Sequence, residues 1–219
     1  MQLFILSHRK NFLTKYPFLV VFHEKGELIE FRFDVLKRVF LSDKKEPTIY
    51  SNLIAEMSDY FKEHFECDLI PLNLDFMVNV CKRDENVKLI AQSMKLPNGG
   101  NAQLDVGNNQ EYILPFIGEL RSLLNDNQAE LEKVPDFREA LEQFMFEMEE
   151  MSDYPWIELL WENEIKTRSN RVKFVFNYMN KSYCLIQYYY SNVLIGMERM
   201  NYVIEYIVNH RNDDTTQNE

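Results

Sequence analysis

The sequence predicts an α+β fold in which antiparallel hairpins from both ends of the chain pack against helices, with an acidic helical segment in the middle. Two stretches, 18–33 and 171–190, alternate apolar and polar residues around a turn signal, as half-buried hairpins do. Each is followed by a segment whose apolar residues recur at helical spacing. The third observation is charge, because residues 126–170 hold thirteen acidic residues and only four basic ones.

The N-terminal part begins with a strand over residues 1–7 and a hairpin whose tight turn is Lys25-Gly26. With that turn, apolar residues of the two hairpin strands face each other on one side of the sheet. These cross-strand pairs are Phe18 with Phe33, Val20 with Phe31, and Phe22 with Ile29. A short helix over 34–41 and a longer one near 48–66 follow. The apolar face of the longer helix consists of Tyr50, Leu53, Ile54, Met57, Phe61, His64 and Phe65.

The sequence pattern in the middle of the chain predicts two strands, then a loop and then helices. Residues 72–80 alternate apolar with polar side chains and predict a strand, with 87–94 as its partner. Residues 97–109 hold three of the six glycines and predict one long flexible loop. We expect three helices after it, opened by Pro115, by Asp136 as an N-cap, and by Pro155. Their predicted buried residues are Phe116, Ile117, Leu120 and Leu124; Phe137, Leu141, Phe144, Met148 and Met151; and Trp156, Ile157, Leu160 and Trp161.

The C-terminal unit, 171–209, is the most apolar and most periodic part of the chain. Asn180-Lys181 is the predicted hairpin turn, and Ser191 is the predicted N-cap of the last helix. That helix carries a continuous apolar stripe of Val193, Met197, Met200, Ile204 and Ile207. We expect 1–110 to form an α+β part and 111–210 a helical segment plus hairpin and helix that shares its core. Residues 211–219 have no apolar side chain and are expected to be a disordered tail.

Composition excludes several classes of protein. The apolar runs are too short to span a bilayer, and the N-terminus lacks the regions of a secretory signal. Three cysteines without a Cys-x-x-Cys pair indicate reduced thiols in a cytoplasm. The net charge of −11 predicts repulsion from free nucleic acid and from anionic membranes, unless the basic region 1–50 does the binding. We therefore expect a cytoplasmic protein with no membrane partner and no direct binding to nucleic acid.

The sequence contains no complete constellation of residues for catalysis, metal binding or a cofactor. No serine lies in a Gly-x-Ser-x-Gly elbow, and residues 98–101 lack the Gly-Lys-Ser/Thr ending of a phosphate-binding loop. Cys81 and Cys184 fall in strand patterns and are interpreted as small core residues. The histidines are isolated from one another and from any cysteine cluster, and they are His8, His23, His64 and His210. The prediction is no catalytic residue, no metal and no cofactor.

The acidic segment is the most distinctive feature, and it has two interpretations. The simpler is the solvated face of a helix. The sharper is a surface that attracts a basic protein, such as one that acts on nucleic acid, and neutralises or regulates it as an inhibitor of the immunity or anti-defence kind. We adopt the second interpretation and expect the protein to come from a bacterium or a phage. The predicted partner-binding residues are Glu139, Glu142, Glu147, Glu149, Glu150 and Asp153.

Two other functions stay open. Glu164-Ile165-Lys166 has the Glu-x-Lys form of some metal-dependent nucleases, in which carboxylates hold a divalent ion and the lysine assists the attacking water. The second alternative is an oligomeric scaffold, because seven of the twelve tyrosines lie between Tyr178 and Tyr206 and tyrosine is favoured at interfaces. Stacking of nucleic-acid bases on these tyrosines is disfavoured by the lack of surplus basic residues around them.

Overall fold

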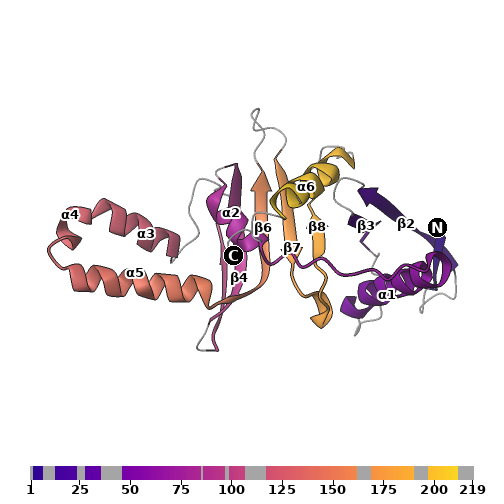
Figure 1. The fold of residues 1–219 in the computed structure, drawn as a ribbon, viewed down its shortest axis with the longest axis horizontal. Helices are drawn as coiled ribbons and strands as arrows, with labels where there is room; N and C mark the ends of the chain where they lie inside the picture. Colours follow the sequence, from indigo (N-terminus) through magenta and orange to yellow (C-terminus); the bar gives the residue numbers. More distant parts are fainter. Residues whose placement is uncertain are drawn as a thin grey trace. The chain divides into compact units, whose positions relative to one another are not determined.

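A computed structural model describes residues 2–6, 13–23, 28–35, 46–84, 86–96, 99–106, 117–161, 169–189 and 197–211. These residues form an α+β fold with two antiparallel sheets, which confirms the predicted fold class (Figure 1). The chain divides into two compact units, Met1–Pro71 and Leu72–Glu219. No helix within these described ranges is both long enough and apolar enough to cross a bilayer.

The first unit is a three-stranded sheet with one helix. Its strands β1 (Gln2–Leu6), β2 (Leu13–His23) and β3 (Leu28–Phe33) lie in the order β1-β2-β3. The predicted hairpin register is confirmed, since Phe18 pairs with Phe33, Val20 with Phe31 and Phe22 with Ile29. The predicted long helix is also confirmed as α1 (Glu46–Phe65). The proposed helix over 34–41 lies mostly outside the described residues.

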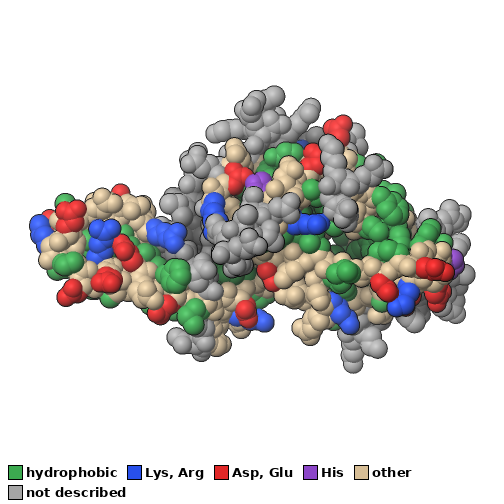
Figure 2. Space-filling model, in the orientation of Figure 1, with side chains coloured by type: hydrophobic (Ala, Val, Ile, Leu, Met, Phe, Trp, Pro, Cys, Tyr) green, Lys and Arg blue, Asp and Glu red, His purple; other side chains and the backbone are tan. Residues whose placement is uncertain are grey.

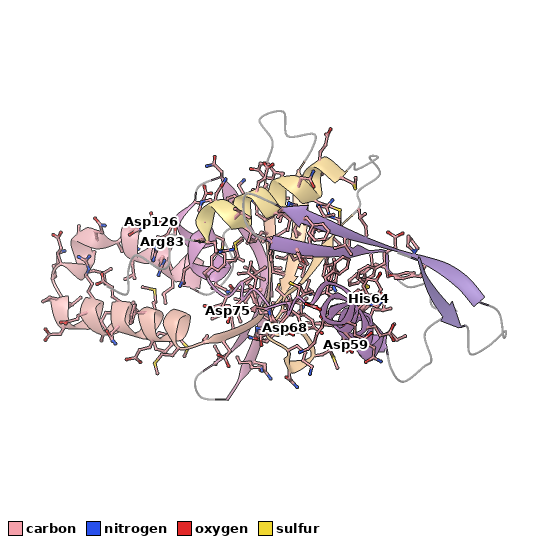
Figure 3. The ribbon with its side chains drawn as sticks, turned by 45° about the vertical axis from the view of Figure 1, so that its right-hand side comes forward. Asp59, His64, Asp68, Asp75, Arg83 and Asp126 are labelled. Atoms are coloured by element: carbon pink, nitrogen blue, oxygen red, sulfur yellow. The ribbon has the colours of Figure 1, made fainter. Side chains whose placement is uncertain are left out.

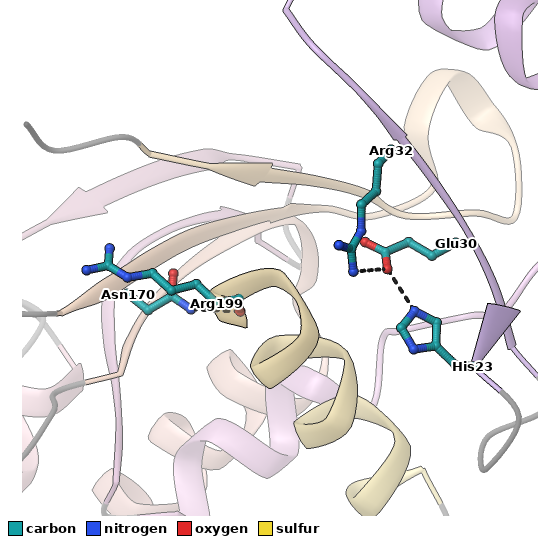
Figure 4. Close-up of polar contacts among 5 residues, drawn as sticks. All are labelled: His23, Glu30, Arg32, Asn170 and Arg199. Carbon is teal, nitrogen blue, oxygen red and sulfur yellow. Dashed lines mark hydrogen bonds and ion pairs between the residues drawn. The ribbon is translucent and has the colours of Figure 1, made fainter. Parts of the chain in front are cut away.

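The core of the first unit follows from the period-2 pattern of the hairpin. Phe18, Met57 and Phe61 are buried together, with the rings of Phe18 and Phe31 5.5 Å apart. The opposite side of the hairpin carries polar residues that satisfy one another. His23 Nε2 lies 2.9 Å from Glu30 Oε2, and Arg32 Nη2 donates to the same oxygen at 2.7 Å (Figure 4).

The second unit is built on a five-stranded sheet in the order β5-β4-β6-β7-β8. Its strands are β4 (Val87–Lys95), β5 (Asn101–Asp105), β6 (Asp153–Trp161), β7 (Asn170–Val175) and β8 (Leu185–Tyr188). Every neighbouring pair in this sheet is antiparallel. Strand β6 is central, so the rest of the second unit is assembled around it.

The central strand β6 corrects the predicted helix at Pro155. Pro155 lies near the start of the strand, where its missing N–H costs little, and its carbonyl accepts from the Phe176 N–H at 3.0 Å. The run that resembled a helical face is buried on both sides of the sheet, with Ile157 at 0%, Leu160 at 1% and Trp161 at 3% exposure. A short apolar run of this kind has no clear period, so neighbours distant in sequence decide its structure.

Helix α6 (Met197–His210) packs on one face of this sheet. Its buried residues are Val203, Ile204, Tyr206 and Ile207, and the Tyr206 ring meets the Trp161 ring edge-on at 5.4 Å. Asn170 at the start of β7 donates to the Arg199 carbonyl at 3.2 Å (Figure 4). The predicted stripe is partly confirmed, since Ile204 and Ile207 are buried whereas Met197 is 59% exposed. Val193 and Ser191 lie outside the described residues.

The predicted strand over 72–80 is wrong. A turn at Asp75-Phe76 leads into helix α2 (Met77–Arg83). The buried residues Leu74, Met77, Val78 and Cys81 are spaced at helical intervals, which the alternating pattern of the same stretch concealed. Cys81 therefore lies on a helix, where its Sγ donates to the Val78 carbonyl.

The predicted long loop over 97–109 contains strand β5, which pairs with β4 from Lys95–Asn101 to Ala91–Asp105. Leu96 and Gly100 close the turn with a hydrogen bond of 2.7 Å. Gly99 has φ +85°, a conformation that strongly favours glycine. Gly99 and Gly100, two of the three glycines that suggested a flexible loop, thus belong to a hairpin turn.

The predicted C-terminal hairpin is confirmed in β7 and β8, with Phe174 opposite Ile186. Its connection spans 176–184 and is longer than the predicted two-residue turn. Asn177, Met179 and Asn180 all have positive φ, between 45° and 58°. Asparagine tolerates that region better than most residues, which explains the two asparagines in the turn.

The acidic middle segment forms a helical arm, defined here as α3 (Ile117–Asp126), α4 (Gln128–Leu131) and α5 (Pro135–Glu150) (Figure 1). Pro135 occupies the first helical turn of α5, so Asp136 is not its N-cap as predicted but an acid in the first turn, where the helix dipole favours it. Pro115 and Phe116, predicted to open α3, lie outside the described residues.

Candidate functional site

The helical arm carries all of the predicted partner-binding residues except Asp153. Glu139, Glu142 and Glu147 are exposed on α5, and Asp153 is exposed where β6 begins. The structure does not describe the side chains of Glu149 and Glu150, although both belong to α5. Figure 2 shows acidic and hydrophobic side chains side by side on the arm.

Acidic groups on the arm outnumber their counter-charges. Residues 117–150 contain ten acidic and three basic residues. Lys133 Nζ lies 2.7 Å from Glu130, and Arg138 Nε lies 2.7 Å from Glu142, a contact that raises the pKa of Arg138. Glu139 makes no ion pair within the described part of the chain, and Asp126 ends α3 (Figure 3). The arm therefore presents a net negative potential that its own cations do not cancel.

The arm also exposes large apolar side chains. The predicted buried stripe is wrong at three positions, because Phe137 is 61%, Phe144 is 40% and Met151 is 65% exposed. Met145, which the stripe omitted, is the buried residue at 5% exposure. A groove of about 430 Å³ runs along the other side of α5, and it is lined by Arg121, Glu139, Glu142, Gln143, Met145 and Phe146. Exposed aromatic side chains are typical of a surface that binds another protein.

A second polar constellation lies on the central sheet. The register places Glu158 of β6 opposite Lys173 of β7, and Trp156 and Arg171 lie on the same side two residues away. Trp161 and its partner Asn170 belong to the opposite side, which α6 covers. We call the side with Trp156, Glu158, Arg171, Lys173 and Tyr189 the polar sheet face.

Charges on the polar sheet face are held at short range. Arg171 Nε donates to Glu158 Oε1, and the Glu158 side chain is only 5% exposed against 36% for Arg171. The Arg171 guanidinium lies 5.2 Å from the centre of the Tyr189 ring. Lys173 Nζ lies 3.5 Å from the centre of the Trp156 ring. Such cation–π contacts are attractive because the ring face is negative.

The pKa directions on this face have clear physical causes. The hydrogen bond to Glu158 raises the pKa of Arg171. Burial lowers the pKa of the Lys173 amine, and the charge of Glu158 opposes this without reversing it. Burial also raises the pKa of Tyr189, as does the nearby Glu158. These groups therefore form one electrostatically coupled set.

Sequence reasoning missed the polar sheet face because it assigned Glu158 to the solvated side of a helix. The signal was present, since Trp156, Glu158 and Leu160 alternate with Ile157 and Leu159. Alternation was obscured because both sides of the strand are largely buried.

The other predicted chemical groups are dispersed. His64, on α1 (Figure 3), is exposed. Its ring stacks on that of Tyr60 with 4.1 Å between the ring centres. No group of three or more His, Cys, Asp or Glu residues among the described positions is arranged to hold a metal. Burial raises the pKa of the Cys184 thiol, which disfavours its reactive thiolate. Glu164 and Lys166 of the nuclease-like tripeptide lie outside the described residues.

Comparisons with known proteins add no assignment. The sequence matches no protein-family model, no curated protein and no solved structure. Function must therefore be argued from the two surfaces themselves.

Proposed function

We propose that this chain is a non-enzymatic binding protein that captures a basic protein partner through the helical arm. The partner class is a protein that acts on nucleic acid, because such proteins carry the clustered Lys and Arg that would complement the arm. Capture would neutralise or regulate that partner by covering its basic surface.

The observation that supports this proposal best is the pairing of uncompensated acids with exposed aromatics on one helix. Exposed carboxylates alone are usually just a solvated helix face. Here Phe137 and Phe144 lie seven residues apart on one side of α5, and Phe146 is 58% exposed beside Glu139 in the groove. Aromatic side chains supply affinity on desolvation, whereas the charges steer association.

The test is a pull-down from the lysate of the native host with tagged full-length protein. Proteins are eluted at about 0.1 M and then 0.5 M NaCl and are identified by mass spectrometry. Over that range the Debye length falls from about 10 Å to a few ångströms, which weakens attraction between exposed charges. The proposal predicts a basic protein that binds at low salt and elutes at high salt. Recovery of no basic protein under either condition would refute it.

Matched variants assign the binding surface. Glu139→Gln with Glu147→Gln removes two charges from the arm, and Glu63→Gln with Glu205→Gln removes the same charge from exposed positions on other helices. We expect the first pair to reduce capture about fivefold or more and the second to change it little. Phe137→Ser with Phe144→Ser should also abolish capture, whereas Ile70→Ser, at a 90% exposed position off the arm, should not.

A further inference from the structure

The polar sheet face carries two cations, Arg171 and Lys173, whose hydrogen-bond donors are not all bonded within the described residues. Lys173 makes no hydrogen bond or ion pair with any residue that the structure describes, although its side chain is only partly exposed. An ammonium group has three donors, and leaving them without acceptors in a partly desolvated place is costly. A bound oxyanion would satisfy them.

Arg171 offers donors beside that ammonium group. Its Nε is bonded to Glu158, and a guanidinium carries five N–H donors in a planar fork. Its side chain remains 36% exposed, so its outer nitrogens can reach a ligand at the surface. Arg171 and Lys173 are two residues apart on one strand, so they project from the same side. Together they can contact neighbouring phosphates. Glu158 and Asp105 both act on Arg171, whereas Lys173 forms no ion pair with either acid.

The two rings lie too far apart to be covered by one base. Trp156 pairs with Val175, whereas the Tyr189 N–H bonds to the Arg171 carbonyl, four residues back along β7. That separation is roughly 13 Å along the strand and about 10 Å across two strands. Tyr189 is 44% exposed and Trp156 is partly exposed. Arg171 and Lys173 lie over one face of these rings, so each ring could stack one base of a longer chain on its other face.

We propose that the polar sheet face binds single-stranded nucleic acid, with Trp156 and Tyr189 as stacking surfaces and Arg171 and Lys173 as phosphate contacts. This revises the expectation, drawn from the net charge of −11, that the chain does not bind nucleic acid directly. The revision rests on where the acids lie. Ten of them belong to residues 117–150 of the arm, whereas β7 contributes two cations and no acid. The proposal is independent of partner capture by the arm.

The test is fluorescence anisotropy of fluorescein-labelled dT12 with the full-length protein at 50 and 150 mM NaCl. The wild-type protein should bind the single strand, and a 12-base-pair duplex should bind at least tenfold more weakly because its bases are not free to stack. Lys173→Gln should weaken binding and make the slope of log affinity against log salt less steep by about 0.7, the value for one lost phosphate contact. Lys181→Gln is the control, because Lys181 is an exposed lysine in the β7–β8 connection and its loss changes the net charge equally.

The stacking role is tested at the exposed ring. Tyr189→Leu should weaken binding by about 5- to 150-fold, and Tyr189→Phe, which keeps the ring, should retain most of it. The proposal is overturned if dT12 does not bind at 50 mM NaCl, or if duplex and single strand bind equally. Equal losses in Lys173→Gln and Lys181→Gln, or equal losses in the two Tyr189 variants, would also overturn it. Glu139→Gln with Glu147→Gln on the arm should leave dT12 binding in place.

Discussion

The buried carboxylate of Glu158 gives the sharpest test of the central strand. Its side chain is 5% exposed and bonded to Arg171, which is 36% exposed. Removing one member of a fully buried ion pair costs about 3–5 kcal/mol. In Glu158→Ala the remaining Arg171 can turn toward water, so we expect a smaller loss of about 2 kcal/mol in the free energy of unfolding. Arg171→Gln should cost more, about 3–5 kcal/mol, because it leaves the carboxylate buried without its partner.

Urea denaturation followed by circular dichroism at pH 7 measures both values. With a slope of about 2 kcal/mol/M, Glu158→Ala should lower the midpoint by about 1 M. Glu205→Ala is the control, since Glu205 is exposed on α6 and its loss should change stability by less than about 0.5 kcal/mol. If Glu158→Ala behaves like this control, Glu158 is a solvated residue and the placement of β6 is refuted. Arg171→Gln should also lose more unfolding free energy than Glu158→Ala, because equal small losses in the two variants would indicate an exposed ion pair.

Three further predictions follow from single contacts. Leu159→Ala, at a position with 0% exposure in β6, should lower the unfolding free energy by about 2–5 kcal/mol in the same assay. Burial raises the pKa of Asp84, but hydrogen bonds from Asn86 and from Tyr206 Oη, the latter at 2.8 Å, lower it further than burial raises it. The stability that this carboxylate contributes is therefore present above the unfolded carboxyl pKa of about 4 and is lost as pH falls through the lower folded pKa. Asp84→Asn should therefore cost about 1 kcal/mol at pH 7 and less at pH 3, and an equal cost at both values would contradict this. Iodoacetamide at pH 8 should modify the exposed Cys67 well before Cys184, whose thiol pKa is raised by burial, as mass spectrometry of early time points would show.

Local pattern predicted the elements whose partners are close in sequence. The β2–β3 hairpin was predicted to the register because each apolar residue has its partner within one turn, as in Val20 with Phe31. The prediction failed at strand β6 because its short apolar run has no clear period, and the pairing with β4, which ends at Lys95, and with β7 decides that it is a strand. The prediction failed at helix α2 for a related reason, since Leu74 and Val78 satisfy both a period of two and a helical period, whereas the buried Met77 fits only the helix. The acidic residues of the arm could be found from sequence, but the exposure of Phe137 and Phe144 depends on which side of α5 packs.

The distribution of charge, rather than its sum, decides which partners the chain can attract. At physiological ionic strength, screening limits the range over which an exposed charge acts to about 8 Å. A ligand therefore responds to the residues around its site and not to the net charge of −11. On the arm the nearby groups are carboxylates such as Glu139 and Glu147, which favour a cationic partner. On the polar sheet face Glu158 is neutralised by Arg171, which leaves Lys173 as the group that a ligand meets. One chain can therefore present surfaces of opposite preference. Rising salt should release both ligands and therefore does not separate the two proposals. The variants do, because those on the arm should weaken only partner capture and those on the polar sheet face only binding of dT12.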